Sequence, residues 1–567
     1  MAISNLSTAQ TPLLDDASLY YKGRPVHRSN SGGWRYASFI IVVEIAERFA
    51  NYGISSNLIT FLTGPLGEST AVAATQVNAW SGASSLLPLL GAFIADSFLG
   101  QYRTIILAFL LYILVKQFPF LLLREFIMPG IWCLGLLSLL DALPSVSNSS
   151  DQSTDNIILS SSAQFQVTLF FFSLYLVAFG QGGHKPWVQA FGVDQFDRQD
   201  PEECKAQSSF FNWWYFSICA GTFITLWILT YIQDNLSWTL GFGIPAIVMV
   251  VGLLVFELGT TTYIYSIKGD EENPFLRIGR VFILAVRNWK TTSSAIAAEE
   301  EARGTLPTES SKQFKFLNKA LLAPDGSKEQ GKVCSTGEVE KAKTVIRLAP
   351  IWVASLFYAI VYAQMITFFT KQGATMDRSI TAGFKIPAAS LLSFISLTIM
   401  VFISIYDRIF VPLARALTRK PTGITMLQRI ETRMLLSAIS MLIAILVEMR
   451  RLKTAEECGL VDKPNVTVPM SIWWLLPQYI LSGLSDVSVG LALYLSIFGV
   501  GSFLSSFFIS AIEKMTGEGG QDSWFANNLN RAHLDYFYWL LAALSAMGLA
   551  LYLCSAKSYI YARGSTL

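Results

Sequence analysis

Long apolar segments alternate with short polar ones along most of the chain. About 20 helical residues are needed to cross about 30 Å of hydrocarbon. Segments of this length lie at roughly residues 36–62, 72–99, 102–143, 164–190, 210–232 and 238–264. The pattern therefore predicts membrane-spanning helices in the first half of the chain.

A second group of apolar segments follows a polar stretch from Lys268 to Lys343. Its members lie at roughly residues 345–370, 387–415, 427–448, 469–513 and 535–555. Two multi-span halves around one hydrophilic linker are typical of transporters, in which two bundles enclose a site near the middle of the bilayer. We expect an all-α polytopic membrane protein made of five regions: an N-terminal tail (1–35), a bundle (36–265), a linker (266–343), a second bundle (344–555) and a C-terminal tail (556–567).

The placement of basic residues predicts the orientation in the membrane. Arg28 and Arg35 precede the first span, and Arg408 and Arg419 lie between two later spans. Because loops rich in Lys and Arg stay on the cytoplasmic side, we expect both tails and the linker to be cytoplasmic. A short amphipathic piece of the linker, around residues 314–322, is expected to be an interfacial helix.

Composition narrows the function classes. Only 14% of the residues are charged, against about 25% in soluble domains. The net charge of +2 offers no basic patch for nucleic acid. The six cysteines have no paired spacing, which argues against disulfides and zinc.

No phosphate-binding Gly-Lys-Ser/Thr loop, HExxH motif or EF-hand loop occurs. We expect no metal and no cofactor, and a proton or ion gradient as the energy source. Three histidines do not supply the constellation of a membrane enzyme, so we expect none.

Three charged residues lie inside the first span, at Glu44, Glu47 and Arg48. Each charge within a span costs on the order of 3 kcal/mol on insertion scales. The spacing of i, i+3 and i+4 places them on one helical face. One carboxylate can pair with Arg48 and the other is left over, which indicates a proton carrier. The alternative is an ion pair that only fixes helix packing.

Other isolated charges are further candidates. Lys185 ends an uncharged apolar run and needs a carboxylate if it is buried, or else reaches to the membrane edge. Asp486 is the only acid between Pro469 and Ile512, and is either functional or a helix-capping residue. Asp96 and Arg103 are about two helical turns apart, a spacing that suits a latch between helices on the cytoplasmic side.

Several of these motifs together resemble a known family. They are Glu44-Ile-Ala-Glu47-Arg48, the loop from Gly91 to Arg103, Gly182-Gly183-His184-Lys185-Pro186 with Phe191-Gly-Val-Asp194-Gln195-Phe196, and the aromatic run from Phe210 to Phe216. The chain resembles the proton-dependent oligopeptide transporters over nearly its whole length, and within them the plant nitrate and peptide transporter family. The resemblance implies the major facilitator fold, in which two six-helix bundles, about 12 spans in all, rock about a central cavity.

The resemblance also implies roles for individual residues. Glu44, Glu47 and Arg48 match the proton-coupling motif, and Lys185 matches its ion partner. Asp486 stands where peptide-binding members usually have a glutamate that contacts the substrate amino group. Tyr362, in the segment that includes Gln364, stands where a nitrate-transporting relative has a histidine. The expected substrate-binding residues are Arg48, Lys185, Tyr362, Gln364 and Asp486, and the expected gating residues are Asp96 and Arg103.

Three stretches depart from the family pattern. Residues 115–133 resemble an insertion, and Glu431 and Arg433 stand where close relatives usually have glycines. The tenth span lacks its continuation after Asp486. The carboxylate of Asp486 is then expected in one of two positions. It lies either at a turn near the membrane edge, out of reach of the cavity, or at normal depth beside a half-helix gap. Both arrangements predict weak transport.

The function that these observations favour is a proton-coupled symporter of a small solute, either nitrate or a di- or tripeptide. Its partners would be that solute, protons and the lipid bilayer. The alternatives are a substrate-sensing receptor of the same fold, an inactive family member, or a sequence with a gene-structure error. The expected location is the vacuolar or the plasma membrane. The stretch Thr11-Pro-Leu13-Leu14-Asp15 resembles a vacuolar dileucine signal.

Overall fold

The computed structural model describes residues 18–19, 33–94, 102–110, 154–196, 200–260, 263–266, 274–289, 314–321, 334–381, 383–410, 412–413, 416, 426–486, 491–517 and 523–558. The chain divides into two compact units. The first unit contains residues 1–267 and 356–546, and the second contains residues 268–355 and 547–567. The suspected insertion at 115–133 lies outside the described residues.

The first unit is a bundle of long helices. Its N-terminal half contains α1 (Trp34–Ser55), α2 (Leu58–Thr63), α3 (Thr70–Ile94), α6 (Thr154–Val193), α7 (Pro201–Asn235) and α8 (Trp238–Leu258). Its C-terminal half begins with the end of α11 (Thr336–Tyr362) and continues with the π-helix η4 (Met365–Phe369), α12 (Thr370–Ala374), the 3₁₀ helix η5 (Ala388–Leu392), α13 (Ser393–Ile405) and the π-helix η6 (Tyr406–Phe410). It then runs through α15 (Met426–Glu457), the 3₁₀ helix η7 (Ile472–Leu475), α16 (Leu476–Ser485), α17 (Leu491–Gly517) and the first part of α18 (Leu534–Ser558). The last part of α18, from Met547, belongs to the second unit.

Strands are short and lie at helix ends. β1 (Ser18–Leu19) pairs antiparallel with β2 (Tyr265–Ser266), and β4 (Ser379–Thr381) pairs antiparallel with β5 (Phe384–Lys385). β3 (Met376–Asp377) pairs parallel with β6 (Val468–Ser471). None of the described strands forms more than a two-stranded sheet, so the architecture of the described residues is helical.

Seven helical stretches in the described part of the chain are long and apolar enough to cross a membrane. They are Thr70–Ile94, Pro201–Asn235, Leu240–Leu258, Thr336–Ala374, Leu427–Glu457, Tyr494–Gly517 and Leu534–Lys557. The prediction of an all-α, multi-pass membrane protein is confirmed.

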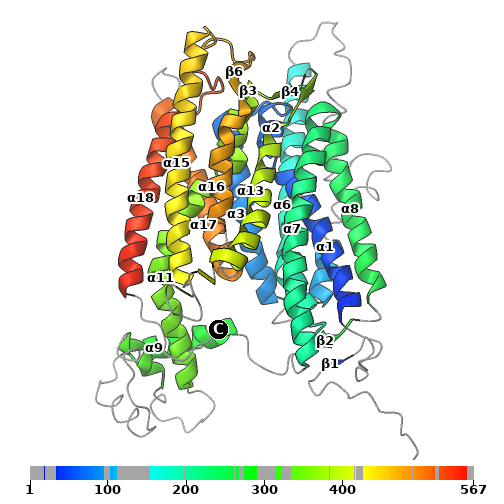
Figure 1. The fold of residues 1–567 in the computed structure, drawn as a ribbon, viewed down its shortest axis with the longest axis vertical. Helices are drawn as coiled ribbons and strands as arrows, with labels where there is room; N and C mark the ends of the chain where they lie inside the picture. The colour runs from blue at the N-terminus through cyan, green and yellow to red at the C-terminus, as the bar shows by residue number, and fades with distance from the viewer. Residues whose placement is uncertain are drawn as a thin grey trace, which may run out of the picture. The chain divides into compact units, whose positions relative to one another are not determined.

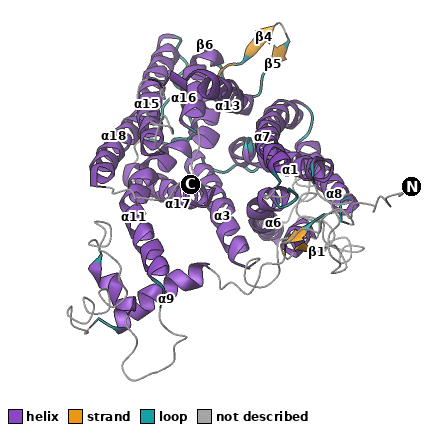
Figure 2. Ribbon diagram, turned by 60° about the horizontal axis from the view of Figure 1, so that its bottom comes forward, coloured by secondary structure: helices purple, strands orange, loops and turns teal. Residues whose placement is uncertain are grey.

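The two halves of the first unit meet along α3 and α17, and along α7 and α13. Figures 1 and 2 show α1, α7 and α8 on one side and α13, α15 and α16 on the other. Small residues allow close approach at the α3–α17 contact, where a Cβ atom built on Gly82 would lie 3.0 Å from the carbonyl oxygen of Gly499. Within the N-terminal half, a Cβ atom on Gly91 of α3 would lie 2.1 Å from the carbonyl oxygen of Gly182 on α6. These backbones therefore touch directly, as glycine at a helix contact permits.

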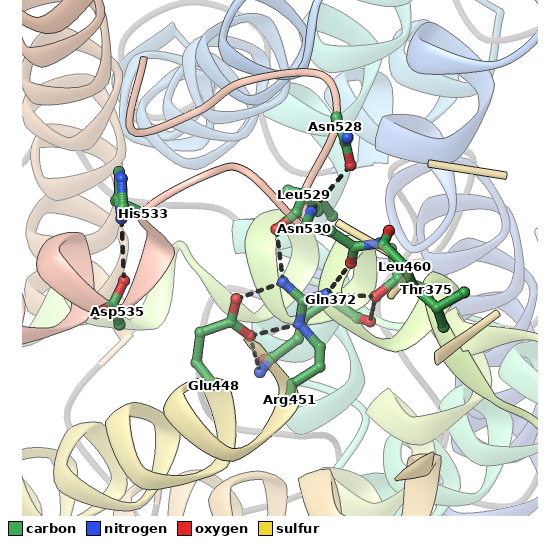
Figure 3. A network of polar contacts seen from close by, with 10 residues as sticks. All are labelled: Gln372, Thr375, Glu448, Arg451, Leu460, Asn528, Leu529, Asn530, His533 and Asp535. Atoms are coloured by element: carbon green, nitrogen blue, oxygen red, sulfur yellow. Dashed lines mark hydrogen bonds and ion pairs between the residues drawn. The ribbon is translucent and has the colours of Figure 1, made fainter. Parts of the chain in front are cut away.

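A buried ion pair ties together the C-terminal half (Figure 3). Arg451 on α15 donates to both carboxylate oxygens of Glu448, at 2.6 and 2.9 Å, and neither residue is exposed to solvent. Gln372 of α12 donates to Glu448 at 2.6 Å. Arg451 also donates to the Leu529 carbonyl oxygen and to the Asn530 side chain. The network therefore joins α12, α15 and the segment before α18.

The second unit holds the amphipathic helix α9 (Pro274–Arg287) and the 3₁₀ helix η3 (Lys315–Leu321). Their apolar faces pack on each other and on the start of α11; the buried residues include Val281, Leu317 and Val339. The segment expected to form an interfacial helix, residues 314–322, coincides with η3, and its interfacial position stays a prediction. α9 lies inside the expected linker, where the apolar pattern did not predict a helix.

Candidate functional site

The first unit encloses a cavity of about 670 Å³. Its wall comes from α1, α3, α6 and α7 of the N-terminal half, and from the end of α11, η4, α13 and α17 of the C-terminal half. In the described residues, three charged side chains line it, namely Arg48, Lys185 and Asp486. The rest of the wall is mainly aromatic, hydroxyl and amide side chains, among them Tyr52, Ser84, Gln189, Trp214, Tyr215, Tyr362, Tyr494 and Phe498. The size and the mixed wall suit a small polar solute.

The three charges predicted on one face of the first span do lie together. Arg48 donates to Glu44 Oε1 at 2.8 Å, and its Nε atom lies 3.5 Å from Glu47 Oε2. Both carboxylates are buried, with Glu44 2% and Glu47 0% exposed. Within the described residues, neither oxygen of Glu47 has a hydrogen-bond partner. The helix thus presents one carboxylate that accepts a hydrogen bond from Arg48, and a second carboxylate that interacts with the charges of Arg48 and Lys185.

Lys185 reaches the same region from α6. It donates to Gln181 Oε1 at 3.2 Å, and Gln181 in turn donates to Asn51 of α1 at 3.0 Å. Within the described part of the chain, Lys185 makes no ion pair, although the charge of Glu47 acts on it. The neighbouring His184 is fully buried, with its ring edge-to-face against Phe109 at 5.2 Å. Lys185 therefore keeps an uncompensated charge at the cavity wall.

Asp486 also lines the cavity, directly after the last residue of α16. Its Oδ1 atom lies 3.1 Å from Arg433 Nη2, and its Oδ2 atom accepts a hydrogen bond from Tyr362 at 3.4 Å. Of the two positions expected for this carboxylate, the turn near the membrane edge, out of reach of the cavity, is wrong. α16 has only 10 residues, about 15 Å of helix, so its end lies at the depth of the cavity and not at the far surface.

Arg433 was noted in the sequence only as a departure from a family glycine. The structure shows it buried on α15 behind the wall, 6% exposed. Its guanidinium lies 4.1 Å from the ring centre of Tyr358 and 5.4 Å from that of Phe498. Arg433 is a basic residue in a segment that is otherwise predicted to span the membrane. This position was the signal that could have identified Arg433 as the partner of a buried acid such as Asp486.

Gln364 is the predicted substrate-binding residue that the structure does not bring to the cavity. It is fully buried, and its amide donates to the Ile360 carbonyl oxygen at 2.7 Å and to the Ser505 hydroxyl at 2.8 Å. These bonds hold the start of the π-helix η4 against α17. Its neighbours Tyr362, Ala363 and Met365 line the cavity instead.

The predicted gating pair is described only in part. Arg103 lies in a helical segment over residues 102–110 and is exposed. Asp96 lies outside the described residues. The latch between these two side chains stays a prediction.

Comparison with known proteins decides the family. A sequence model of the POT family matches residues 126–524. The chain belongs to the POT family. Protein NRT1/PTR FAMILY 5.10 of Arabidopsis thaliana is 58% identical over 586 aligned residues and covers all of both chains. Protein NRT1/PTR FAMILY 5.14 of the same plant is 52% identical, over 96% of each chain. The resemblance found in the motifs is therefore confirmed.

Solved structures of this family share the fold. The crystal structure of an auto-inhibited POT family peptide transporter matches with a TM-score of 0.64 and 20% identity, over 94% of this chain and 99% of the other. A POT family transporter in complex with 5-aminolevulinic acid matches with a TM-score of 0.58 and 16% identity, over 92% and 96%. The all-α fold of the major facilitator type is confirmed for this POT family member, an integral membrane transporter of peptides or other small solutes.

Proposed function

We propose that this POT family member is a proton-coupled symporter of a small solute, either nitrate or a di- or tripeptide, and that it works by alternating access. The observation that carries the proposal is the state of Glu47. It is a fully buried carboxylate that accepts no hydrogen bond from the described part of the chain, and it lies 3.5 Å from the guanidinium of Arg48. Burying a charge without hydrogen bonds costs free energy. Protonation is therefore more favourable at Glu47 than at Glu44, which accepts a hydrogen bond from Arg48.

Proton uptake by Glu47 would change its partners. While Glu47 is charged, it competes with Glu44 for Arg48 and attracts Lys185. Once it is protonated, Arg48 and Lys185 have less negative charge beside them and bind a substrate anion more strongly. Proton and substrate would then be loaded together, as symport requires, with the proton gradient as the energy source and without a cofactor.

The polar contacts between the two halves support an alternating-access cycle. Lys371 donates to Thr63 at 2.7 Å, and the Asn78 amide donates to Ser505 at 3.0 Å. Thr230 and Ser390 lie 2.8 Å apart. The contacts of Thr63 and of Thr230 lie at the end of the bundle that holds α2, and the contact of Asn78 lies between that end and the cavity. The cavity-lining residues of α7 and α17 come from the first part of each helix. With the predicted orientation, this arrangement corresponds to a state closed to the outside, and in a vacuolar protein to a state closed to the vacuole.

Uptake into proteoliposomes tests the proposal. Purified full-length protein would be reconstituted into vesicles. Labelled nitrate and labelled dialanine would be offered with and without an inward proton gradient, in which the outside is more acidic than the inside. We expect accumulation of at least one of them above its external concentration, and loss of accumulation when a protonophore collapses the gradient. Substrate binding without flux would contradict the proposal and favour a sensing receptor, and flux that ignores the gradient would contradict proton coupling.

A further inference from the structure

The carboxylate of Asp486 already has a cation inside the protein. Arg433 lies 3.1 Å from it, and the arginine is held in an aromatic pocket, with Tyr358, Phe498 and Tyr494 between 4.1 and 5.8 Å from its guanidinium. Cation–π contacts of this kind stabilise a desolvated guanidinium. Arg433 does not itself line the cavity. The pair is therefore a built feature of the wall, with its negative member towards the cavity.

The position of Asp486 at a helix end strengthens the pairing. It follows the last residue of α16, and its backbone N–H donates to the Gly483 carbonyl oxygen. The C-terminal end of a helix carries partial negative charge, so a carboxylate there is unfavourable unless a cation accompanies it. Arg433 supplies that cation for both the carboxylate and the helix end. Removing it would leave two negative groups together at the wall.

The charges on and directly behind the cavity wall sum to a positive value once Glu47 is protonated, as the proposed function requires. Arg48 is then offset by Glu44, and Asp486 is offset by Arg433. Lys185 remains, with the neutral Gln181 as its hydrogen-bond partner. In this protonation state the wall offers one unpaired cation and no unpaired anion in the described part of the chain.

We propose that Arg433 is a fixed counterion that withdraws Asp486 from substrate binding and so makes the cavity selective for small anions that carry no amino group. This inference rests on the proposed function, because it names the substrate class of the same cavity. An anion pairs with Lys185. Asp486, the carboxylate that would bind the ammonium group of a zwitterion, is already paired with Arg433. The ammonium group is therefore desolvated without a partner, which is unfavourable.

A pair of probes that differ in one charge tests the inference. Dialanine and N-acetyl-dialanine have the same carboxylate, and only dialanine carries an ammonium group, which is charged at pH 6.5 because its pKa is about 8. Binding of each to the purified full-length protein in detergent would be measured by calorimetry, with nitrate as a third probe. We expect N-acetyl-dialanine to bind at least about tenfold more tightly than dialanine, the scale of one buried charge pair.

Substitutions at Arg433 assign the effect to that residue. Arg433→Gln should reverse the order of the two probes, because Asp486 is then free to pair with the ammonium group. Arg433→Lys keeps a cation and should keep the wild-type order. The double variant Arg433→Gln with Asp486→Asn carries no charge at either position. It should fold even if the single variant Arg433→Gln does not. It should bind N-acetyl-dialanine no less tightly than dialanine.

Two outcomes would overturn the inference. One is a wild-type protein that binds dialanine as tightly as N-acetyl-dialanine. The other is a folded Arg433→Gln protein that keeps the wild-type order. Because the binding assay contains no gradient and the two probes carry the same carboxylate, their relative order does not depend on whether uptake is coupled to protons. Uptake without proton dependence would contradict the proposed function and leave the order of binding intact.

Discussion

Arg378 lies 3.5 Å from Asp234, so a cation from the strand region of the C-terminal half meets a carboxylate near the end of α7 in the N-terminal half. Asp234 also accepts a hydrogen bond from Asn57 at 2.7 Å. Together with the contact between Lys371 and Thr63, this pair holds the halves together at the end that contains α2. Opening of this end must separate Arg378 from Asp234.

Arg378→Gln should therefore favour opening at this end. The pair is partly exposed and is worth about 0.5–1 kcal/mol, so we expect labelling of the cavity from this side to rise about threefold. Cys219 lines the cavity, and a variant that keeps it as the only cysteine would report access to a membrane-impermeant maleimide.

The matched control for Arg378→Gln is Arg531→Gln. Arg531 pairs with Asp462, and both belong to the C-terminal half, so this loss should leave labelling unchanged. Equal labelling of the Arg378→Gln and Arg531→Gln proteins would show that the pair between the halves does not hold this end closed.

Glu47→Gln should remove the response of uptake to pH. The variant keeps the shape of the side chain and cannot release a proton, so the gradient no longer biases the transport cycle. We expect a final ratio of internal to external substrate of about one, with normal amounts of protein in the membrane. Glu202→Gln makes the same change on the exposed start of α7 and should keep the wild-type ratio. An unchanged pH response in the Glu47→Gln protein would remove Glu47 from the mechanism.

Lys185→Ala should affect uptake more than binding. Loss of one cation from the wall is expected to weaken anion binding about tenfold, whereas loss of the partner for Glu47 should stop gradient-driven uptake. Affinity from calorimetry and uptake from proteoliposomes would be compared for the same preparation. Lys205→Ala, at an exposed pair with Glu202, is the control. Equal fractional losses in the two assays would favour a purely structural role for Lys185.

Glu448→Gln should destabilise the C-terminal half. Arg451 would stay fully buried and lose its charged partner, and such a loss destabilises by about 3 kcal/mol or more. Unfolding in detergent, followed by tryptophan fluorescence, would measure the change. Lys453→Ala breaks an exposed pair on the same helix and should change stability by less than about 1 kcal/mol. A Glu448→Gln protein as stable as the Lys453→Ala protein would contradict a supporting role for the network.

The sequence predicted the part of the site that depends on rare residues in spans. Glu44, Glu47, Arg48, Lys185 and Asp486 all stand out as charges among apolar residues, and the structure places each at or beside one cavity. The expectation for Gln364 had no such basis. An uncharged amide in a span serves equally well as a bridge between helices, and it bonds to Ser505.

The sequence alone did not predict the depth of helix ends in the membrane or the ion pairs between the two halves. The apolar pattern from Pro469 to Ile512 does not show where a helix begins, so it could not place the end of α16 at the cavity. Asp234 and Arg378 are far apart in the chain and lie at helix and strand ends, where no periodicity relates them. The pairing of Arg433 with Asp486 within the C-terminal half also depended on depth, because the partner of Arg433 is defined only once the end of α16 is placed.

The contact between Gly91 and Gly182 limits how the protein can move. Because the backbones of α3 and α6 touch there, no side chain larger than a hydrogen atom fits between the two helices. Lys185 lies three residues beyond Gly182 on α6, and Glu47 lies on α1 of the same half. We therefore expect α3 and α6 to move as one body during alternating access, and Lys185 to approach Glu47 by a change in its own side-chain conformation.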